Sequence, residues 1–176
     1  MAERIEKLGF SQDITKNELL GVLKKEASKI HIIDIMKAAT FLREDAKYMQ
    51  ASYREDYINT FTKAFFSRIK NVKDDKKEYK GFIDSKKLQE FLEVLNCQKK
   101  EAKNENELCF LEIARIVSIY TTFILEASIH PVGTLFPGGF KLKFENGAYL
   151  CPVKERQMDT PSALCRFCVS KQDDSA

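Results

Sequence analysis

The stretch LCFLEIARIVSIYTTFILEASI, residues 108–129, decides the fold. It is apolar around most of a helical circumference, and Asn104 and Glu107 supply the polar residues that commonly open a helix. A helix of this kind needs neighbours on several sides to cover it. We therefore predict one continuous helix from Asn104 to Ile129 at the centre of a helical bundle.

Apolar residues at helical spacing predict the surrounding helices. Thr15 and Glu18, three positions apart, form a capping-box pattern that satisfies free backbone amides at a helix start. Charged stretches without apolar periodicity, at 70–80 and 98–107, predict exposed loops. The predicted helices run from Thr15 to Ile30, from Asp34 to Met49, from Ser52 to Val72, and from Asp84 or Ser85 to Leu95.

The last third of the chain changes to a period of two. FKLKFENGAYLCPVK, residues 140–154, alternates apolar and polar side chains around Asn146-Gly147, a pair that favours a type I′ hairpin turn. Because side chains alternate across a strand, this turn places its apolar pairs on one face, with Cys151 pointing toward the core. The expected pairs are Phe144 with Tyr149, Leu142 with Cys151, and Phe140 with Val153.

A final short helix is expected to begin at Asp159 or Thr160. Pro161 would lie in its first turn, where the missing N–H costs nothing. Cys165 and Cys168 would then share one face of this helix, because their spacing is close to one helical turn.

These elements predict a mainly α protein. Residues 1–129 are expected to form a multi-helix bundle. Residues 130–176 are expected to add a small β-hairpin and a short helix, stapled by a metal and packed on the bundle as one domain.

Composition excludes several function classes. The chain has 176 residues and a net charge of +3, which suits one globular domain and lacks the concentrated positive charge of nucleic-acid binders. Its longest charge-free apolar run has ten residues, against about 18 needed to span a bilayer, so no membrane association is expected. The opening MAERIEKLGFSQD lacks the apolar region of a secretory signal, so we expect a cytoplasmic protein.

The cysteines carry the functional hypothesis. A cytoplasmic protein with five cysteines is expected to keep them reduced. Cys151, Cys165 and Cys168 form C-x13-C-x2-C, and two thiolates separated by two residues can bind the same tetrahedral metal. Zinc prefers thiolate and imidazole ligands, so the expected site is zinc bound by these three cysteines and His130. The alternative is that the cysteines are ordinary buried side chains.

The identity of the fourth ligand is open among His130, Cys109 and Cys97. In a continuous helix Cys109 and His130 would lie about 31 Å apart, so they cannot both bind one ion. His130 is favoured because a short loop joins it to the strand that pairs with the Cys151 strand. An iron–sulfur cluster is the alternative, with Cys109, Cys97 or, unusually, a histidine as the fourth ligand. Pro152 follows Cys151, as in ferredoxin-type runs. Without a cluster, Cys97 and Cys109 are expected to be packing residues.

Two classes of function remain open. A structural metal predicts a binding or assembly role with an unidentified protein partner. An enzyme would use zinc with an open position and Asp159 or His130 as base, or a cysteine nucleophile paired with His130. No catalytic motif decides whether the protein is an enzyme. A nucleic-acid-binding module ranks third: the knuckle-like cysteines and the slight basic excess motivate it, and the small net charge argues against nucleic acid as a partner.

Three motifs give the chain a family likeness: HPVGTLFPGG at 130–139, CPVK at 151–154 and ALCRFC at 163–168. On these motifs the chain resembles an uncharacterised family of unknown function from methanogenic archaea. The specific likeness covers about forty residues, 129–168, with weaker similarity in the preceding helical region. This resemblance implies an archaeal, cytosolic origin and brings no known activity, cofactor or site residue.

Overall fold

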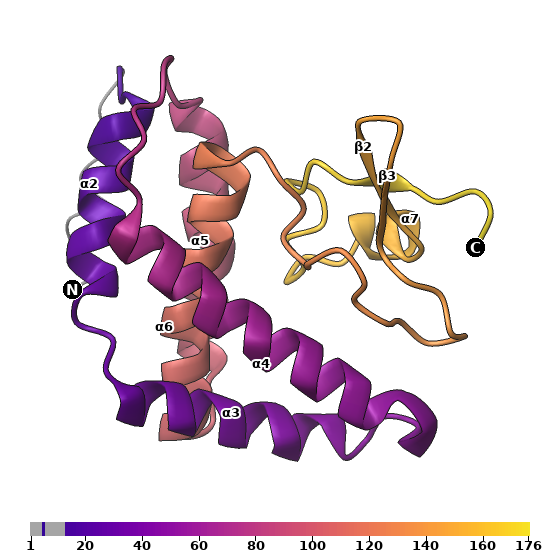
Figure 1. The fold of residues 1–176 in the computed structure, drawn as a ribbon. Helices are drawn as coiled ribbons and strands as arrows, with labels where there is room; N and C mark the ends of the chain where they lie inside the picture. The colour runs from indigo at the N-terminus through magenta and orange to yellow at the C-terminus, as the bar shows by residue number, and fades with distance from the viewer. Residues whose placement is uncertain (1–4, 6–12) are drawn as a thin grey trace.

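A bundle of helices around α6 forms most of this computed structural model, which describes Ile5 and residues 13–176 (Figure 1). Helix α6 contacts α2, α3, α4 and α5, which confirms its predicted central position. None of the helices in the described residues is both long enough and apolar enough to cross a membrane. The helix bounds are α2 (Lys16–Ala27), α3 (Ile32–Ala46), α4 (Ala51–Asp74), α5 (Ser85–Glu101) and α6 (Glu105–Ile119).

The expectation that the chain opens without a secretory signal concerns residues 1–13. Most of this segment, residues 1–4 and 6–12, lies outside the described residues.

Local capping signals placed several helix starts correctly. Thr15 Oγ1 accepts a 3.2 Å hydrogen bond from the Glu18 N–H, and the Glu18 carboxylate accepts one of 2.8 Å from the Thr15 N–H. The side chains of Asp84 and Asn104 each accept a hydrogen bond from the N–H three residues later, at 3.0 and 2.9 Å. These bonds satisfy donors that a helix start leaves free, which confirms the predicted starts of α2, α5 and α6.

Two stretches predicted as loops are partly helical. Helix α4 continues to Asp74 and α5 continues to Glu101. Basic side chains lie in the last turns of both helices, where positive charge is favourable beside the free carbonyl groups. Lys73 also donates a 3.0 Å hydrogen bond to the carbonyl of Ile30, which anchors the last turn of α4. Helix α4 begins after Gln50 instead of after Ser52.

The prediction of one continuous helix over 104–129 is wrong at its C-terminal end. Helix α6 passes into a π-helical turn, η1 (Tyr120–Ile124). Thr121 Oγ1 donates a 2.6 Å hydrogen bond to the carbonyl four residues earlier, an interaction that competes with the helical ladder and bends helices. Glu126 then takes a φ of 51°, which ends the helix. His130 therefore lies beyond the helix instead of closing it.

Asp75 connects η1 to the segment that follows α4. Its carboxylate accepts hydrogen bonds from the hydroxyls of Tyr120, at 2.7 Å, and Tyr79, at 2.8 Å. Burial, and then the hydrogen bond to Asp75, raise the pKa of Tyr120, so its phenol stays protonated and able to donate. Lys24 Nζ donates to the Asp75 carbonyl oxygen. These contacts hold the end of the central helix in place.

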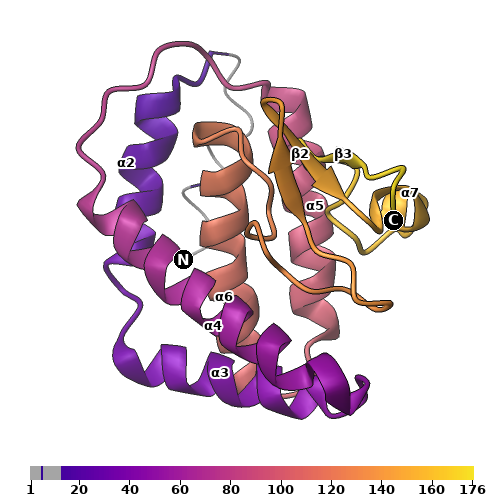
Figure 2. The same cartoon turned by 45° about the vertical axis from the view of Figure 1, so that its right-hand side comes forward.

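A small sheet with the strand order β1-β2-β3 lies in the C-terminal part of the chain (Figure 2). Strands β1 (Lys143–Glu145) and β2 (Ala148–Cys151) form the predicted antiparallel hairpin. Asn146 and Gly147 have φ values of 50° and 77°, as a type I′ turn requires. Strand β3 (Lys171–Gln172), which the sequence did not predict, pairs in parallel with β2.

The predicted hairpin face is only partly right. Phe144 pairs with Tyr149, as expected, and their rings are 4.7 Å apart. Cys151 and Leu142 are both buried in one apolar cluster. Phe140, however, accepts a 2.8 Å backbone hydrogen bond from the N–H of residue 136 and remains 43% exposed. The loop before β1 folds back on itself, so the hairpin does not extend to the Phe140–Val153 pair.

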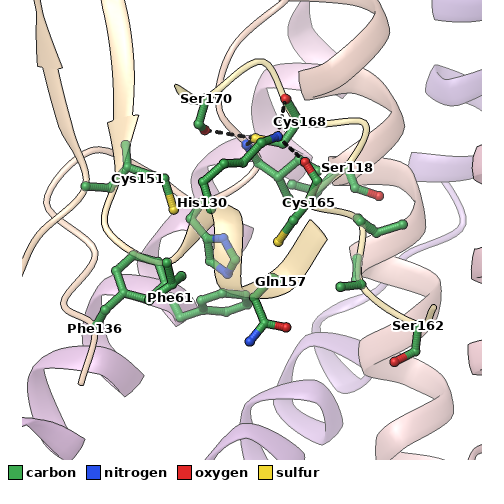
Figure 3. Close-up of a pocket in the computed structure, with 18 of the residues that line it drawn as sticks. Phe61, Ser118, His130, Phe136, Cys151, Gln157, Ser162, Cys165, Cys168 and Ser170 are labelled. Atoms are coloured by element: carbon green, nitrogen blue, oxygen red, sulfur yellow. Dashed lines mark hydrogen bonds between the residues drawn. The ribbon is translucent and has the colours of Figure 1, made fainter. Parts of the chain in front are cut away.

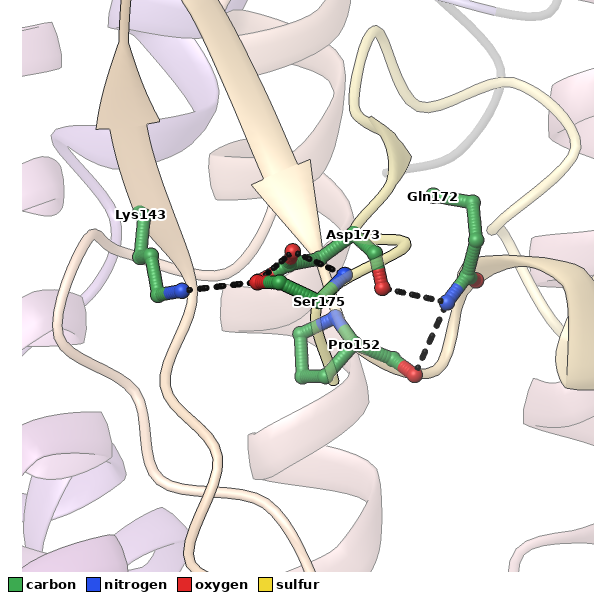
Figure 4. Close-up of polar contacts among 5 residues, drawn as sticks. All are labelled: Lys143, Pro152, Gln172, Asp173 and Ser175. Atoms are coloured by element: carbon green, nitrogen blue, oxygen red, sulfur yellow. Dashed lines mark hydrogen bonds and ion pairs between the residues drawn. The ribbon is translucent and has the colours of Figure 1, made fainter.

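Asp173 anchors the end of the described chain to the sheet (Figure 4). Its buried carboxylate lies 3.1 Å from Lys143 Nζ on β1 and accepts hydrogen bonds from the hydroxyl and N–H of Ser175, at 2.6 and 3.0 Å. The Ser175 hydroxyl, followed by Lys143, lowers the pKa of Asp173. Gln172 Nε2 donates a 3.2 Å hydrogen bond to the Pro152 carbonyl. These contacts explain how so short a strand as β3 is held.

The predicted C-terminal helix is misplaced. The helix in this region, α7 (Lys154–Met158), is short and begins earlier, and the chain over 160–170 forms turns. Cys165 and Cys168 therefore do not share a helix face. They lie in a turn in which the Cys168 N–H donates a 3.2 Å hydrogen bond to the Cys165 carbonyl.

Packing of one large side chain explains this turn. Phe167 is buried in the main core, with its ring centre 5.1 Å from that of Phe91 on α5. Leu164 packs against the same core. These two contacts attach the C-terminal segment to the bundle.

Candidate functional site

A cavity of about 490 Å³ lies between the bundle and the C-terminal segment (Figure 3). Helices α4 and α6 supply aromatic and apolar side chains on one side. The loop after η1, strand β2, helix α7 and the turns over 160–170 supply the other side. The cavity is therefore built by segments that lie far apart in the sequence.

All of the predicted metal ligands line this cavity. They are His130, Cys151, Cys165 and Cys168, contributed by a loop, a strand end and a turn. Cys97 and Cys109, the alternative ligands, do not line it. Cys109 is half-buried on α6, whereas Cys97 is exposed on α5, contrary to its expected packing role.

The side chains face the cavity without forming a closed ligand shell. The sulfurs of Cys151 and Cys165 point into the cavity toward the His130 ring (Figure 3). Within Ile5 and residues 13–176, no three histidine, cysteine or acidic side chains lie close enough together to hold one metal ion. The assignment of these residues as ligands thus stays a prediction.

His130 lies in an aromatic environment. Its ring packs edge-on against Phe61 and Phe136, with ring centres 5.7 and 5.4 Å away. Burial lowers the pKa of His130 to about 4, because an imidazolium is poorly solvated there. The ring is therefore neutral near pH 7, and a neutral imidazole is the form that binds metals.

Cys151 ends β2 and is followed by a tight turn. Burial raises the pKa of its thiol. Hydrogen bonding from the backbone of Val153 and Lys154, together with the Lys154 charge, opposes this increase. The turn thus directs donors at a sulfur that is otherwise poorly solvated, which favours the thiolate when a metal is present.

The sulfurs of Cys165 and Cys168 have different surroundings. Burial, and then the nearby sulfurs of Cys151 and Cys168, raise the pKa of Cys165. Cys168 Sγ accepts a 3.4 Å hydrogen bond from the Ile129 N–H and lies 3.0 Å from Ser170 Oγ. The thiols of Cys151 and Cys168 therefore lie near enough to Cys165 to raise its pKa.

Lys154, at the start of α7, organises the turn that carries two of these cysteines. Its ammonium group donates hydrogen bonds to the carbonyl oxygens of Cys165 and Cys168, the latter at 2.8 Å. It also lowers the pKa of Cys151 and Cys165 against the larger effect of burial. Sequence reasoning missed this role, although Lys154 is part of the CPVK motif.

The surroundings of the site argue against a cysteine nucleophile and against Asp159 as a base. A cysteine nucleophile needs a lowered thiol pKa, whereas burial raises the pKa of Cys151 and Cys165. Asp159, the other expected base, is exposed and does not line the cavity.

Sequence reasoning also missed the aromatic side of the cavity. Tyr57, Phe61 and Phe65 on α4 line the cavity together with Phe110 of α6. Helical spacing indicates that these residues share a face, but it does not reveal that the face borders a cavity.

The chain is similar to proteins of methanogenic archaea along most of its length. A "UPF0305 protein" of Methanothermobacter thermautotrophicus is 52% identical over 160 residues, covering 91% of this chain and 98% of the relative. One from Methanocaldococcus jannaschii is 34% identical over 160 residues, covering 89% and 96%. One from Methanopyrus kandleri is 31% identical over 124 residues, covering 69% and 85%.

The comparison with solved structures found no significant match. The family model described as "Uncharacterized protein conserved in archaea (DUF2115)" matches residues 15–173. The resemblance seen in the C-terminal motifs is thus confirmed and extends through the helical bundle. The chain belongs to this archaeal family, DUF2115.

Proposed function

We propose that the protein binds one zinc ion through Cys151, Cys165, Cys168 and His130, and that this metal has a structural role. The observation that supports the proposal is that all four residues, chosen from the sequence, line the same cavity. The two remaining cysteines, Cys97 and Cys109, do not line it. The three cysteines with metal-ligand spacing are thus also the three that line the cavity.

The charges around the cavity favour a zinc ion with this ligand set. Zn²⁺ with three thiolates and a neutral imidazole carries a net charge of minus one. Lys154 is the one charged side chain lining the cavity within the described part of the chain, and it is positive. The lysine would therefore balance the metal centre, in addition to holding the cysteine turn.

Zinc binding requires the ligands to converge. Each thiol must lose its proton, and the cysteine sulfurs must come closer to the imidazole and to one another. The raised pKa values of Cys151 and Cys165 keep these thiols protonated until a metal displaces the protons. The bound metal would join the loop after η1, strand β2 and the cysteine turn, and so fix the C-terminal segment for a binding or assembly role.

Cobalt substitution under anaerobic conditions tests the proposal. Co²⁺ bound by three thiolates gives strong sulfur-to-metal charge-transfer absorption and the visible bands of tetrahedral cobalt. We expect these bands in the wild-type protein and in the Cys97→Ser/Cys109→Ser control, and weaker charge transfer after Cys151→Ser, Cys165→Ser or Cys168→Ser. Absence of thiolate absorption in the wild-type protein would reject the site. If protein purified anaerobically shows an iron–sulfur spectrum, the site would be assigned to an iron–sulfur cluster in place of zinc.

A further inference from the structure

The cavity is much larger than a metal ion requires. Its volume of about 490 Å³ falls in the range of about 300–1,000 Å³ that is typical of small-molecule sites. The sulfurs and His130 occupy one part of it (Figure 3). Side chains of α4 and α6 line the remaining volume, and the proposed metal site does not account for this space.

Aromatic rings form a continuous wall along this remaining volume. The ring centre of Phe61 is 4.6 Å from that of Phe65 and 6.1 Å from that of Phe110, and the last two are 5.3 Å apart. Tyr57 extends the wall at one end, with its ring centre 5.5 Å from Phe61. Such a wall offers ring faces and edges to another aromatic system.

The charge of the lining indicates an uncharged ligand. Of the described side chains that line the cavity, none is acidic and none is an arginine. Lys154, the single cation, already donates to two backbone carbonyls. A cation would therefore lose its hydration without an acidic partner, and an anion would have to share Lys154 with the two carbonyls that it already binds.

A small polar region lies at the end of the cavity away from Cys168. Gln157 and Ser162 lie there, on the Phe61 side of the His130 ring (Figure 3). Gln98 Nε2 donates a 2.6 Å hydrogen bond to the Ser162 carbonyl, which fixes this edge of the cavity. The Gln157 amide can donate and accept, so it suits a ligand with one hydrogen-bonding group.

We propose that the cavity binds an uncharged, flat aromatic molecule that lies against Phe61 and Phe110 and directs a hydrogen-bonding group toward Gln157. This ligand site goes beyond the proposed zinc site and depends on the cavity, not on the metal. Binding by the metal-free protein therefore separates the two proposals.

Three related probes test the chemistry of this site. 2-Naphthol is flat, aromatic and uncharged; 2-decalol is its saturated counterpart; and 2-naphthoate carries a negative charge. Because the chain contains no tryptophan, the fluorescence of 2-naphthol can be followed without indole background. We expect saturable binding of 2-naphthol to the full chain with and without zinc, and binding at least about tenfold weaker for the other two probes.

A cavity-filling variant tests the location. Ala114 lies on α6 and lines the cavity, so Ala114→Leu should weaken 2-naphthol binding by about tenfold or more. Ala51→Leu, at an exposed helical alanine, is the matched control and should leave binding unchanged. In the wild-type protein, nuclear Overhauser contacts from the probe to the rings of Phe61 and Phe110 test the same point without a mutation.

Several results would overturn the proposal: no saturable binding of 2-naphthol, equal binding of all three probes, or contacts to rings elsewhere in the protein. Unchanged affinity in a folded Ala114→Leu variant would also overturn it. Binding by Cys151→Ser/Cys165→Ser/Cys168→Ser protein equal to that of the wild type would support the ligand site, whatever the fate of the zinc proposal.

Discussion

The backbone N–H of Ile129 donates a 3.4 Å hydrogen bond to the sulfur of Cys168. Ile129 directly precedes His130, so this bond connects the segment that carries the imidazole to the turn that carries the cysteine. An N–H donor stabilises a thiolate more than a thiol, so the same bond would strengthen when a metal binds. The segment that carries His130 and the side chain of Cys168 are thus already linked by one hydrogen bond.

Loss of the two thiols in the cysteine turn should loosen the C-terminal segment. We expect Cys165→Ser/Cys168→Ser protein to show faster amide exchange beyond Phe140 and a lower melting temperature than zinc-loaded wild-type protein. The reason is that structural zinc sites supply on the order of 10–16 kcal/mol of apparent binding free energy in small peptides. Hydrogen exchange followed by mass spectrometry measures the effect segment by segment.

The chain supplies a matched control for this experiment. Cys97→Ser/Cys109→Ser protein also loses two thiols, but neither lines the cavity, so exchange beyond Phe140 should not change. Identical exchange and melting of the two double variants would argue against a structural metal.

His130 should make the metal-free protein sensitive to mild acid. Its pKa is about 4 in the folded chain and near 6.5 when unfolded, so acidification protonates the unfolded state first. The contribution of neutral His130 to the free energy of unfolding is therefore fully present above pH 6.5. It is lost as the pH drops toward 4, which lowers the free energy of unfolding by at most about 3 kcal/mol.

Replacement of His130 isolates this effect. The free energy of unfolding of His130→Gln protein should fall less than that of the wild type between these pH values. His31→Gln, at an exposed histidine, serves as the control. Parallel pH profiles for the wild-type and His130→Gln proteins, measured by urea unfolding, would contradict the buried neutral imidazole.

Lys154 should support both the turn and the metal. Lys154→Met removes the ammonium that donates to the Cys165 and Cys168 carbonyls, and we expect a loss of about 1.5–3 kcal/mol in stability. Zinc affinity, measured by competition with a chelator, should fall as well because the charge of the metal centre is no longer balanced. Lys80→Met, in an exposed segment, should change neither quantity. Wild-type zinc affinity in Lys154→Met protein would refute the charge-balance argument.

Asp173 and Asp174 offer a comparison between neighbouring residues. The Asp173 carboxylate is buried against Lys143 and Ser175, whereas Asp174 is exposed. Asp173→Asn should accelerate amide exchange in β3 and β2, and Asp174→Asn should not. Because the folded-state pKa of Asp173 is lowered, its contribution is present at neutral pH and is lost as the pH falls through that lowered value. Equal exchange in both variants would rule out the anchoring role.

Local sequence signals were sufficient for much of the fold. The Thr15–Glu18 box, the Asp84 and Asn104 caps and the Asn146-Gly147 turn each act within a few residues, so their patterns identify the elements that they begin or connect. The apolar character of α6 likewise indicated its central position.

Features that depend on distant contacts could not be predicted. The π-helical turn η1 is held by the contact of Tyr120 with Asp75, which lies far from it in the sequence, and β3 is too short to show a pattern. Phe167 packs on Phe91, which replaces the expected helix with turns. The cysteine spacing identified residues that line one cavity, whereas the aromatic wall and Lys154 became part of the site only through tertiary packing.

Zinc stoichiometry tests the central claim most directly. Full-length protein, reduced and equilibrated with zinc, would be desalted and its metal measured by mass spectrometry, beside Cys151→Ser/Cys165→Ser/Cys168→Ser and Cys97→Ser/Cys109→Ser proteins. We predict one zinc ion per chain for the wild-type protein and the double variant, and almost none for the triple variant. Wild-type protein without bound zinc, or a triple variant that retains it, would contradict the proposed site.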